Sequence, residues 1–432
     1  MAMFSQFLGF MLDAYDMALV LVMAPILVKV FAAPSAGNEA WQYITIVLTY
    51  SITMAARPVG SAIFGHYADK AGRQLLLVIT IGGVGVMSFV AAFLPTYEQI
   101  GMWSYVLFCV VRFLMGCFFG GEYAVGHTFA IEHAPAQRRG LIGGFVQSGF
   151  PAGYVVASLV FAFISYLAGS EVMLSYGWRI GFASGVVPVF LAIYIRRLLP
   201  ESPEFERARE RGDIEKAPFL SLFKRPALWD FLQVFVFMSG LFLTDYSVYG
   251  FLPNILTLGG RGFDTTTYSL IYGFALFMAF LGYNLYGWAS DILGRRKLTM
   301  WYCVFLIAFG IPVYYVLYNA AVARNLALAI LGTTMASMLK LAWGIVPAYL
   351  CERFPTKRRA VGVGFGYSSG ALLGAWFSAY VWWAHQVPFI QAVEKNDMWL
   401  SPAVVLTVGA VMTFASLMYS PETKGVELSA VR

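Results

Sequence analysis

Long apolar segments separated by short polar ones recur along the whole chain. Each apolar segment holds about 20 or more residues with almost no Lys, Arg, Asp or Glu, which as a helix crosses the roughly 30 Å hydrocarbon core of a bilayer. The segments are apolar on all sides, whereas the strands of a β-barrel would alternate. The pattern therefore predicts twelve membrane helices. They lie at residues 4–31, 43–66, 74–95, 101–131, 140–167, 177–199, 228–256, 267–290, 298–318, 324–351, 360–384 and 402–420.

The composition agrees with an all-α integral membrane protein. Hydrophobic residues make up 59% of the 432 residues and charged residues only 12%, which is far from the usual soluble mixture. The first apolar segment is long and contains two Asp residues, so we expect a true membrane span and not a cleaved signal. The four cysteines lie in or beside apolar segments without metal-binding spacing, and we expect them to pack.

Basic residues are concentrated in every second loop. Of the 29 Lys and Arg residues, 21 fall on the side of the membrane that would carry both termini, and 5 fall on the other side. Since positively charged loops stay in the cytoplasm, we expect a cell-membrane protein with cytoplasmic N- and C-termini. The net charge of +6 then reflects topology and contact with membrane lipids, and no nucleic-acid partner is needed.

Three short motifs occur twice, with separations of 220 to 222 residues. They are GHYADKAGR at 65–73 and GWASDILGR at 287–295, EHAPAQRR at 132–139 and ERFPTKRR at 352–359, and PES at 200–202 and PET at 421–423. Internal duplication of this kind is typical of membrane transporters. We therefore predict two six-helix bundles, 1–199 and 228–432, joined by a charged cytoplasmic linker at 200–227.

The repeated motifs place Gly, Asp, Glu and Arg at one end of the membrane helices. Gly allows close helix approach, while the acids and arginines can pair with one another and with helix termini. These residues are candidates for a latch that holds one conformation of two rocking bundles; alternatively, the arginines only anchor the loops. The candidates are Gly65, Asp69, Gly72, Arg73, Glu132 and Arg138 in the first half, and Asp291, Gly294, Arg295, Glu352 and Arg358 in the second.

The paired G-x(3)-D-x-x-G-R motif resembles the loop signature of the major facilitator superfamily, and RFLMG at 112–116 is similar to its R-x-x-x-G motif. Further motifs resemble those of proton symporters for organic acids. The sialate and lactate group is the most similar, followed by the aromatic-acid and metabolite groups. These motifs are LDAYD at 12–16, ARPVG at 56–60, GGEY at 120–123, QSGFPAGY at 147–154, GWR at 177–179 and PESP at 200–203.

The resemblance implies a symporter that carries protons together with a small organic acid anion by alternating access. A sugar, polyol or metabolite transporter or facilitator of the same fold stays the alternative, although the seventh span lacks the Gln-rich motif of sugar porters. A membrane sensor is less favoured, because the segment after Tyr419 is short. The four histidines show no metal-ligand spacing and no nucleophile with its base is evident, so we expect no enzyme, metal or cofactor.

Ionisable residues inside the spans are candidates for function. A charge in a membrane helix costs at least about 2.5–3.5 kcal/mol, so it persists where it is paired or faces a watery cavity. Asp13 and Asp16 are three residues apart, on neighbouring positions of one helix face, and Arg57 lies at a similar depth in the second span. Together they can form a proton site that binds or releases its proton when the pairing with arginine changes. Alternatively, they form a static salt bridge.

Arg112 and Glu122 lie on neighbouring faces of the fourth span. The planar fork of Arg112 can hold a substrate carboxylate or an internal acid, and Glu122 is the nearest such acid. Glu122 itself is a candidate for structural or gating pairing, or for proton transfer.

In the second half, Lys340 lies deep in the tenth span and Asp245 lies in the seventh. Trp343 and Pro347 follow Lys340 at helical spacing, which places a ring and a helix distortion near the same face. Lys340 can bind an organic anion at the interface of the halves or can pair internally with Asp245. A substrate that competes with Asp245 would couple binding to protonation.

The predicted site thus combines two sets of residues, and we expect the protein to work as a monomer. The proton-coupling candidates are Asp13, Asp16, Glu122 and Asp245. The substrate-binding candidates are Arg57, Arg112, Lys340, Gln147, Tyr246, Tyr249, Asn284, Trp343 and Tyr367, with Tyr154 and Trp376 as further cavity candidates. Because most of the acids lie in the first half, we expect proton handling mainly there.

Overall fold

The computed structural model describes residues 1–31, 39–395 and 397–431, and its regular structure there is helical throughout. The first helices are α1 Ala2–Val22, α2 Ala24–Phe31, α3 Glu39–Ala71, α4 Arg73–Ala92, α5 Tyr97–Ile100, α6 Trp103–Glu122, η1 Tyr123–His127, α7 Thr128–Glu132, η2 Ala136–Arg138, α8 Arg139–Gln147, α9 Gly149–Val172, η3 Met173–Gly177, α10 Trp178–Ser184 and α11 Val186–Arg197. Two short helices follow, α12 Pro203–Glu210 and α13 Pro218–Ser221. The remaining helices are α14 Ala227–Asp245, η4 Tyr246–Gly250, α15 Leu252–Thr257, η5 Leu258–Gly260, α16 Thr265–Leu293, α17 Arg295–Val322, α18 Leu326–Met338, η6 Leu341–Ile345, α19 Val346–Arg353, η7 Thr356–Arg358, α20 Arg359–Gly374, α21 Phe377–His385, α22 Pro388–Glu394, α23 Ser401–Met418 and η8 Leu428–Ala430.

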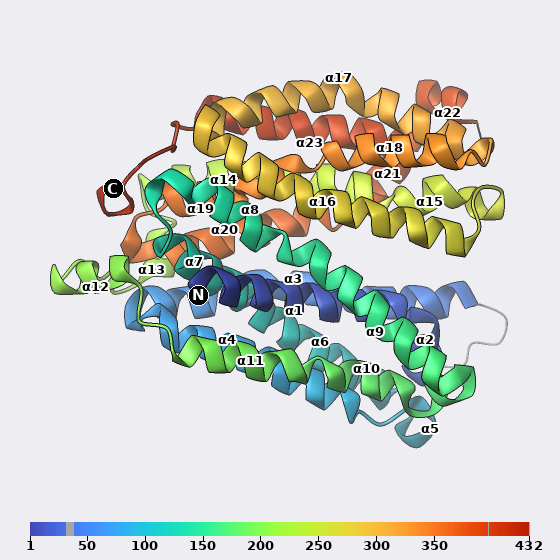
Figure 1. Cartoon of the computed structure of the whole chain (residues 1–432), viewed down its shortest axis with the longest axis horizontal. Helices are drawn as coiled ribbons and strands as arrows, with labels where there is room; N and C mark the ends of the chain where they lie inside the picture. The colour runs from blue at the N-terminus through green and yellow to red at the C-terminus, as the bar shows by residue number, and fades with distance from the viewer. Residues whose placement is uncertain (32–38, 396, 432) are drawn as a thin grey trace.

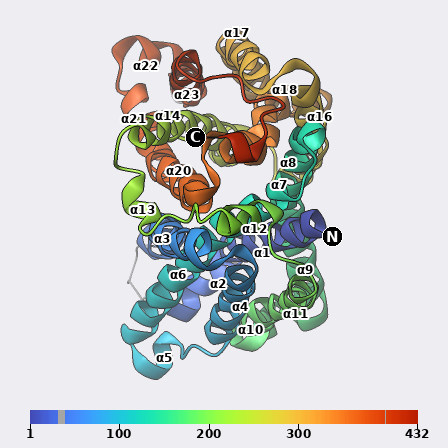
Figure 2. The ribbon, with the colours of Figure 1, turned by 90° about the vertical axis from the view of Figure 1, so that its left-hand side faces the viewer.

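The long helices run roughly along the long axis of the molecule. Most helices up to α11 gather on one side and those from α14 to α23 on the other, while α8 packs beside α16 and α19 of the second group (Figure 1). Both chain ends, α12 and α13 lie at one end of the bundle, which we call the terminal face. Figure 2 shows α12 and the C-terminal segment lying across the middle of this face.

Ten helical segments among the described residues are long and apolar enough to span a membrane. The second predicted span lies in α3, a helix of 33 residues. The eleventh is divided between α20 and α21, with Ala375 and Trp376 between them. The all-helical, polytopic fold is therefore confirmed, whereas the count of twelve spans stays a prediction.

Small residues bring helices close together, both within a group and between the two groups. A side chain at Gly60 would collide with the carbonyl oxygen of Cys117, and one at Gly120 with that of Arg57, so α3 and α6 touch along their backbones. Gly144 of α8 contacts the backbone of α16 in the same manner. Such contacts hold membrane helices together by close packing, because lipid supplies no hydrophobic driving force between them.

Several spans contain an irregular turn at the positions predicted for the site. π-helical turns at Tyr123–His127 and Tyr246–Gly250 interrupt the fourth and seventh spans. In the tenth span, Lys340 leaves helical geometry, with φ −120° and ψ 0°, just before a 3₁₀ turn. Pro347 lies in the first turn of the helix that follows, so the predicted distortion beside Lys340 is present. Such irregular turns often mark functional positions.

Candidate functional site

Two aspartate–arginine pairs lie inside the first group of helices. Asp13 of α1 accepts a hydrogen bond from Arg57 of α3, which also contacts the sulfur of Met17 at 3.0 Å. Asp16, almost one turn further along α1, accepts one from Arg112 of α6. The four charged side chains are at most 3% exposed. The two aspartates therefore do not share Arg57, because each has an arginine of its own.

Each of these pairs leaves polar atoms unsatisfied. Four buried atoms of these pairs have no hydrogen-bond partner among the described residues: Asp13 Oδ2, Asp16 Oδ1, Arg57 Nε and Arg112 Nη2. Buried polar atoms are normally paired, because desolvation without compensation is unfavourable. The second oxygen of each carboxylate can therefore accept a further hydrogen bond without breaking the existing bond to arginine.

Glu122 pairs with Arg196 of α11, and the suggested pairing of Glu122 with Arg112 is absent. Arg196 Nη1 donates to Glu122 Oε2 at 2.8 Å, and its second amino group donates to the other oxygen. The Thr80 hydroxyl also donates to Oε2, at 2.9 Å. Both carboxylate oxygens are thus occupied, and this arrangement resembles a structural clamp between α6 and α11.

Arg196 was not expected at the site, because it lies at the end of an apolar segment, where basic residues usually anchor a loop. Its side chain is fully buried and its guanidinium also contacts Gln6 Oε1 at 3.2 Å. Gln6 in turn contacts His127 Nδ1 at 3.1 Å. The only signal for this cluster was the presence of Glu122 in an apolar span, which requires a cation within reach.

In the second group, Lys340 donates a hydrogen bond to Asp245, so the internal pair exists. The Lys340 ammonium also lies 3.9 Å from the centre of the Tyr249 ring, in a cation–π contact. The Tyr249 hydroxyl donates to the carbonyl of Ala275 at 2.8 Å and contacts Ser337 at 3.0 Å. The Asp245 side chain is 18% exposed, more than any of the first-group carboxylates described above.

Tyrosine side chains connect the two groups of helices around these pairs. Tyr50 of α3 forms side-chain hydrogen bonds with Tyr154 of α9 and with Tyr246 of η4. Tyr123 of η1 stacks on Tyr367 of α20 with 3.5 Å between ring centres. The Tyr50–Tyr246 and Tyr123–Tyr367 contacts join residues from the two sides of the molecule, so aromatic side chains bridge the interface where the charged pairs lie.

The other predicted cavity residues have different surroundings. Gln147 and Trp343 are buried, and Gln147 Oε1 and Trp343 Nε1 have no hydrogen-bond partner among the described residues. Asn284 instead donates to the carbonyl of Phe280 in its own helix, at 2.8 Å. Trp376 is 65% exposed and lies outside the buried cluster. Gln147 and Trp343 therefore have polar atoms available for a ligand.

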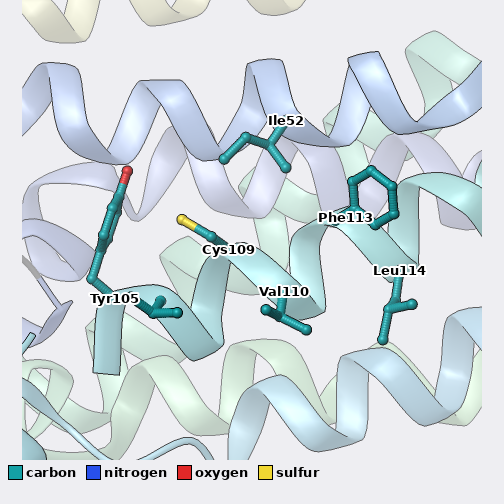
Figure 3. A pocket seen from close by; sticks show the side chains of 7 residues that line it. Ile52, Tyr105, Cys109, Val110, Phe113 and Leu114 are labelled. Carbon is teal, nitrogen blue, oxygen red and sulfur yellow. The ribbon is translucent and has the colours of Figure 1, made fainter. Parts of the chain in front are cut away.

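A surface hollow of about 370 Å³ lies against α3 and α6, away from these pairs (Figure 3). Its lining is Ile52, Tyr105, Val106, Cys109, Val110, Phe113 and Leu114. None of these side chains is charged, and several are more than one-third exposed on the outer face of α6. We interpret this hollow as part of the lipid-facing surface and not as a site for a polar substrate.

At the terminal face, two aspartates make the same contact in the two halves. Asp69 accepts hydrogen bonds from the backbone amides of residues 360 and 361, at 3.0 and 2.9 Å. Asp291 accepts from the amides of residues 140 and 141, both at 2.8 Å. Each aspartate thus caps the N-terminus of a helix in the other half, where the helix dipole favours a negative charge.

Arginine and glutamate residues extend these contacts. Glu132 binds Arg73 at 2.7 Å and Arg359 of the second half at 2.8 Å. Glu352 binds Arg295 at 3.2 Å, within one half. All five side chains are buried, so one ionic cluster joins the halves through Glu132 and a second, related one lies inside the second half.

The arginines that carry these contacts are not those expected in the fourth- and tenth-span motifs. Arg138 is exposed, and the buried Arg139 donates to the carbonyl of Val426 at 2.6 Å. Arg358 is buried but is not the glutamate partner, because its neighbour Arg359 binds Glu132. The second arginine of each pair faces the interface, because adjacent helical residues point about 100° apart.

The predicted glycines allow the close backbone approaches of this face. Gly72 and Gly294 have φ values of +114° and +96°, which strain any residue with a Cβ atom. A Cβ atom at Gly65 would lie 2.7 Å from the Cα atom of Val361 in the other half. A side chain at Gly65 would therefore push the two halves apart.

Comparison with known families gives a match over most of the chain. The family model of the Major Facilitator Superfamily matches residues 6–379. A putative metabolite transport protein of Haemophilus influenzae is 30% identical over 401 residues, covering 89% of this chain and 87% of that protein. The inner membrane metabolite transport protein YhjE of Escherichia coli is 30% identical over 357 residues, covering 80% and 78%.

A proline/betaine transporter of Salmonella typhimurium is 29% identical over 432 residues, covering 96% of this chain and 82% of that protein. Among solved structures, the proton:xylose symporter XylE bound to 6-bromo-6-deoxy-D-glucose gives a TM-score of 0.81 at 19% identity, covering 100% of this chain and 97% of that one. At that identity the likeness concerns the fold alone.

Proposed function

The chain belongs to the Major Facilitator Superfamily, and we propose that it is a proton-coupled symporter of a small carboxylate. The family and the relatives make it a multi-pass membrane transporter and not an enzyme. The substrate class and the coupled proton are inferred from the charged pairs. The observation that carries the proposal is the Lys340–Asp245 pair, which lies at an irregular turn with a partly exposed carboxylate.

A carboxylate substrate can take the place of Asp245 on Lys340. Both carboxylates can accept a hydrogen bond from the same ammonium group. Trp343 follows Lys340 by three residues, and its Nε1–H, which has no partner in the described part of the chain, can donate to the substrate as well. Once displaced, Asp245 would be a poorly solvated charge without its cation, and taking up a proton relieves that penalty. Binding of the anion and binding of a proton are then linked at one site.

The first half supplies a second place for protons. Tyr50, Tyr246 and Tyr367 lie near Arg57, so the Asp13–Arg57 pair is close to the aromatic bridge between the halves. Asp13 Oδ2 is free to hold a proton while Oδ1 keeps its bond to Arg57. A rearrangement of the bridge can therefore change the balance between proton and arginine at Asp13.

Transport would proceed by rocking of residues 1–199 against 228–432, with 200–227 as the cytoplasmic tether. The basic terminal face supports cytoplasmic termini. The contacts of Asp69, Asp291 and Glu132 hold this face closed in the described conformation. We interpret these contacts as latches that must open before substrate leaves on the cytoplasmic side.

A zwitterionic carboxylate is the second candidate substrate. One relative is a proline/betaine transporter, and the tyrosines near Asp245 offer ring faces that attract a substituted ammonium group. In that case Lys340 would bind the carboxylate, and Asp245 with the tyrosines would bind the cation. A neutral sugar is less favoured, because it would leave the Lys340 ammonium without a new anionic partner.

The test is transport by the purified protein in liposomes that contain a pH-sensitive dye. Monocarboxylates, aromatic acids, proline, betaine and sugars are offered outside, with and without an inward proton gradient. We expect carboxylate uptake that acidifies the lumen, that is driven by the gradient, and that Lys340→Met abolishes. Sugar uptake in place of acid uptake would reject the substrate class. Carboxylate flux indifferent to the gradient would reject coupling alone.

A further inference from the structure

A second surface hollow, of about 530 Å³, lies at the terminal-face ends of α17 and α23. Two basic side chains and the carboxylate of Glu422 line one part of it, and apolar side chains line the rest. Its lining is Arg296, Lys297, Met300, Trp301, Val304, Phe414 and Glu422. The hollow thus differs from the apolar one on α3 and α6, because it combines positive charge with an apolar wall.

The lining residues of α17 follow one face of that helix. Four of them follow one another at intervals of three, one and three residues, which places them on one side of the helix: Lys297, Met300, Trp301 and Val304. Trp301 is 66% exposed and Val304 is 47% exposed, which places this face toward lipid. At 1.5 Å per residue, the face runs about 10 Å from the charged end into the hydrocarbon.

The internal duplication shows that the fold does not require these charges. The positions that match Arg296 and Lys297 in the first half are Gln74 and Leu75. The side chain of Gln74 donates to a backbone carbonyl at the end of α11, as the Nε atom of Arg296 does at the end of α23. An uncharged side chain therefore meets the structural need, and Leu75 is simply exposed to lipid.

The neighbouring ionic groups leave Lys297 without an ionic partner. Arg295 is paired with acids of its own half, and the ammonium of Lys424 donates to the carbonyl of Ile292. The carboxylate of Glu422 accepts the backbone amides of residues 295–297 at 2.8–3.4 Å, so it is engaged at the helix start. Among the described residues, Lys297 makes no ion pair, and its side chain is exposed at the mouth of the hollow.

We infer that this hollow binds an anionic phospholipid. The phosphate lies against Lys297 and the guanidinium of Arg296, and an acyl chain lies along Trp301, Val304 and Phe414. Basic pockets between membrane helices at the cytoplasmic surface suit anionic headgroups, and the depth of the apolar face matches the start of an acyl chain. A free inorganic anion would use the charges but leave the apolar wall unused.

The test uses the purified chain in detergent, with lipid binding measured by native mass spectrometry and thermal unfolding. The variant R296Q/K297L installs the residues of the first half, so the new Gln can keep one of the two bonds that Arg296 donates to the carbonyls of Leu417 and Met418. We expect phosphatidylglycerol or cardiolipin to form a one-to-one adduct and to raise the melting temperature of the parent, whereas phosphatidylcholine does not. In R296Q/K297L the adduct falls at least tenfold.

The matched control is K224L/R225Q, which removes two exposed charges from the same face outside the hollow. It should change the adduct less than twofold. Equal losses in both variants would mean that the basic face attracts anionic lipid without a site, and no loss in R296Q/K297L would reject the hollow. Stabilisation of the parent by millimolar inorganic phosphate, undiminished in Trp301→Ala, would also overturn the inference.

Discussion

The buried ion pairs of the two halves differ in how completely they are enclosed. In the first half, each aspartate of α1 has its own arginine, and the paired side chains are at most 3% exposed. In the second half, one lysine pairs with Asp245, whose side chain is 18% exposed. Arginine stays charged, whereas lysine and an exposed carboxylate exchange partners and protons more readily. The comparison suggests tightly enclosed, arginine-bound pairs in the first half and a more accessible, exchangeable pair in the second.

Loss of one member of an enclosed pair should have the largest effect. Arg112→Leu leaves Asp16 as an unpaired charge inside the bundle, and we expect a loss of about 3–5 kcal/mol in the free energy of unfolding. Chemical unfolding in detergent measures this loss. The double variant Arg112→Leu/Asp16→Leu should regain most of it. Equal stabilities of the single and double variants would show that Asp16 does not depend on Arg112 for its stabilisation.

Removal of the lysine in the second half should have a smaller effect on stability. In Lys340→Met, Asp245 keeps partial access to solvent, so we expect a loss of roughly 1–3 kcal/mol, measured under the same conditions. Transport should nevertheless be lost, since the proposed anion contact is gone. A stability loss larger than that of Arg112→Leu would reverse the comparison between the halves.

The two aspartate caps allow a comparison in which the halves should behave alike. Asp69→Asn or Asp291→Asn weakens two charge-assisted hydrogen bonds, and we expect the closed terminal face to lose about 1–2 kcal/mol. Cys351 is buried, with its sulfur 4.0 Å from the carbonyl of His127 across the interface. Opening of the face exposes this sulfur, so weakening the closed face by this amount should accelerate the maleimide labelling of Cys351 roughly 5- to 30-fold.

The variant Cys351→Ser identifies labelling at this cysteine among the four present. Similar acceleration in both aspartate variants would support two equivalent latches. Acceleration in only one of them would mean that the duplicated motif has kept its latch function in a single half.

The smallest effect is expected at an exposed pair, which gives a baseline for charge removal. Arg261 pairs with Asp397, but its side chain is 64% exposed. Arg261→Ala should change the unfolding free energy by no more than about 0.5 kcal/mol. A loss comparable to that of Lys340→Met would show that exposure does not govern the difference between the pairs.

The sequence was informative wherever a local pattern determines structure. Apolar length predicted the helical segments, and Pro347 predicted the irregular turn beside Lys340. A charged residue inside a membrane span needs a partner, and the Lys340–Asp245 pair was one of the two predicted possibilities for Lys340. Each of these inferences depends on neighbours in the chain or on the cost of a charge in lipid.

Contacts set by helix rotation and by long side chains could not be predicted. Whether Arg138 or Arg139 faces the interface depends on the rotation of α8, which packing against the other half decides. Arg196 reaches Glu122 across a bundle from 74 residues away, and no local pattern encodes that distance. The stacking of Tyr123 on Tyr367 likewise requires two halves placed against each other.

The carbonyl of Leu428 accepts a hydrogen bond from Arg359, and that of Val426 accepts one from Arg139, so a late segment of the chain completes the terminal face. During synthesis these residues leave the ribosome after every predicted span. At about 5–20 residues per second, Arg139 waits roughly 15 to 60 s for its partner. Until residues 426 and 428 have been made, Arg139 and Arg359 lack these acceptors, so the terminal face is incomplete for most of the time that synthesis takes.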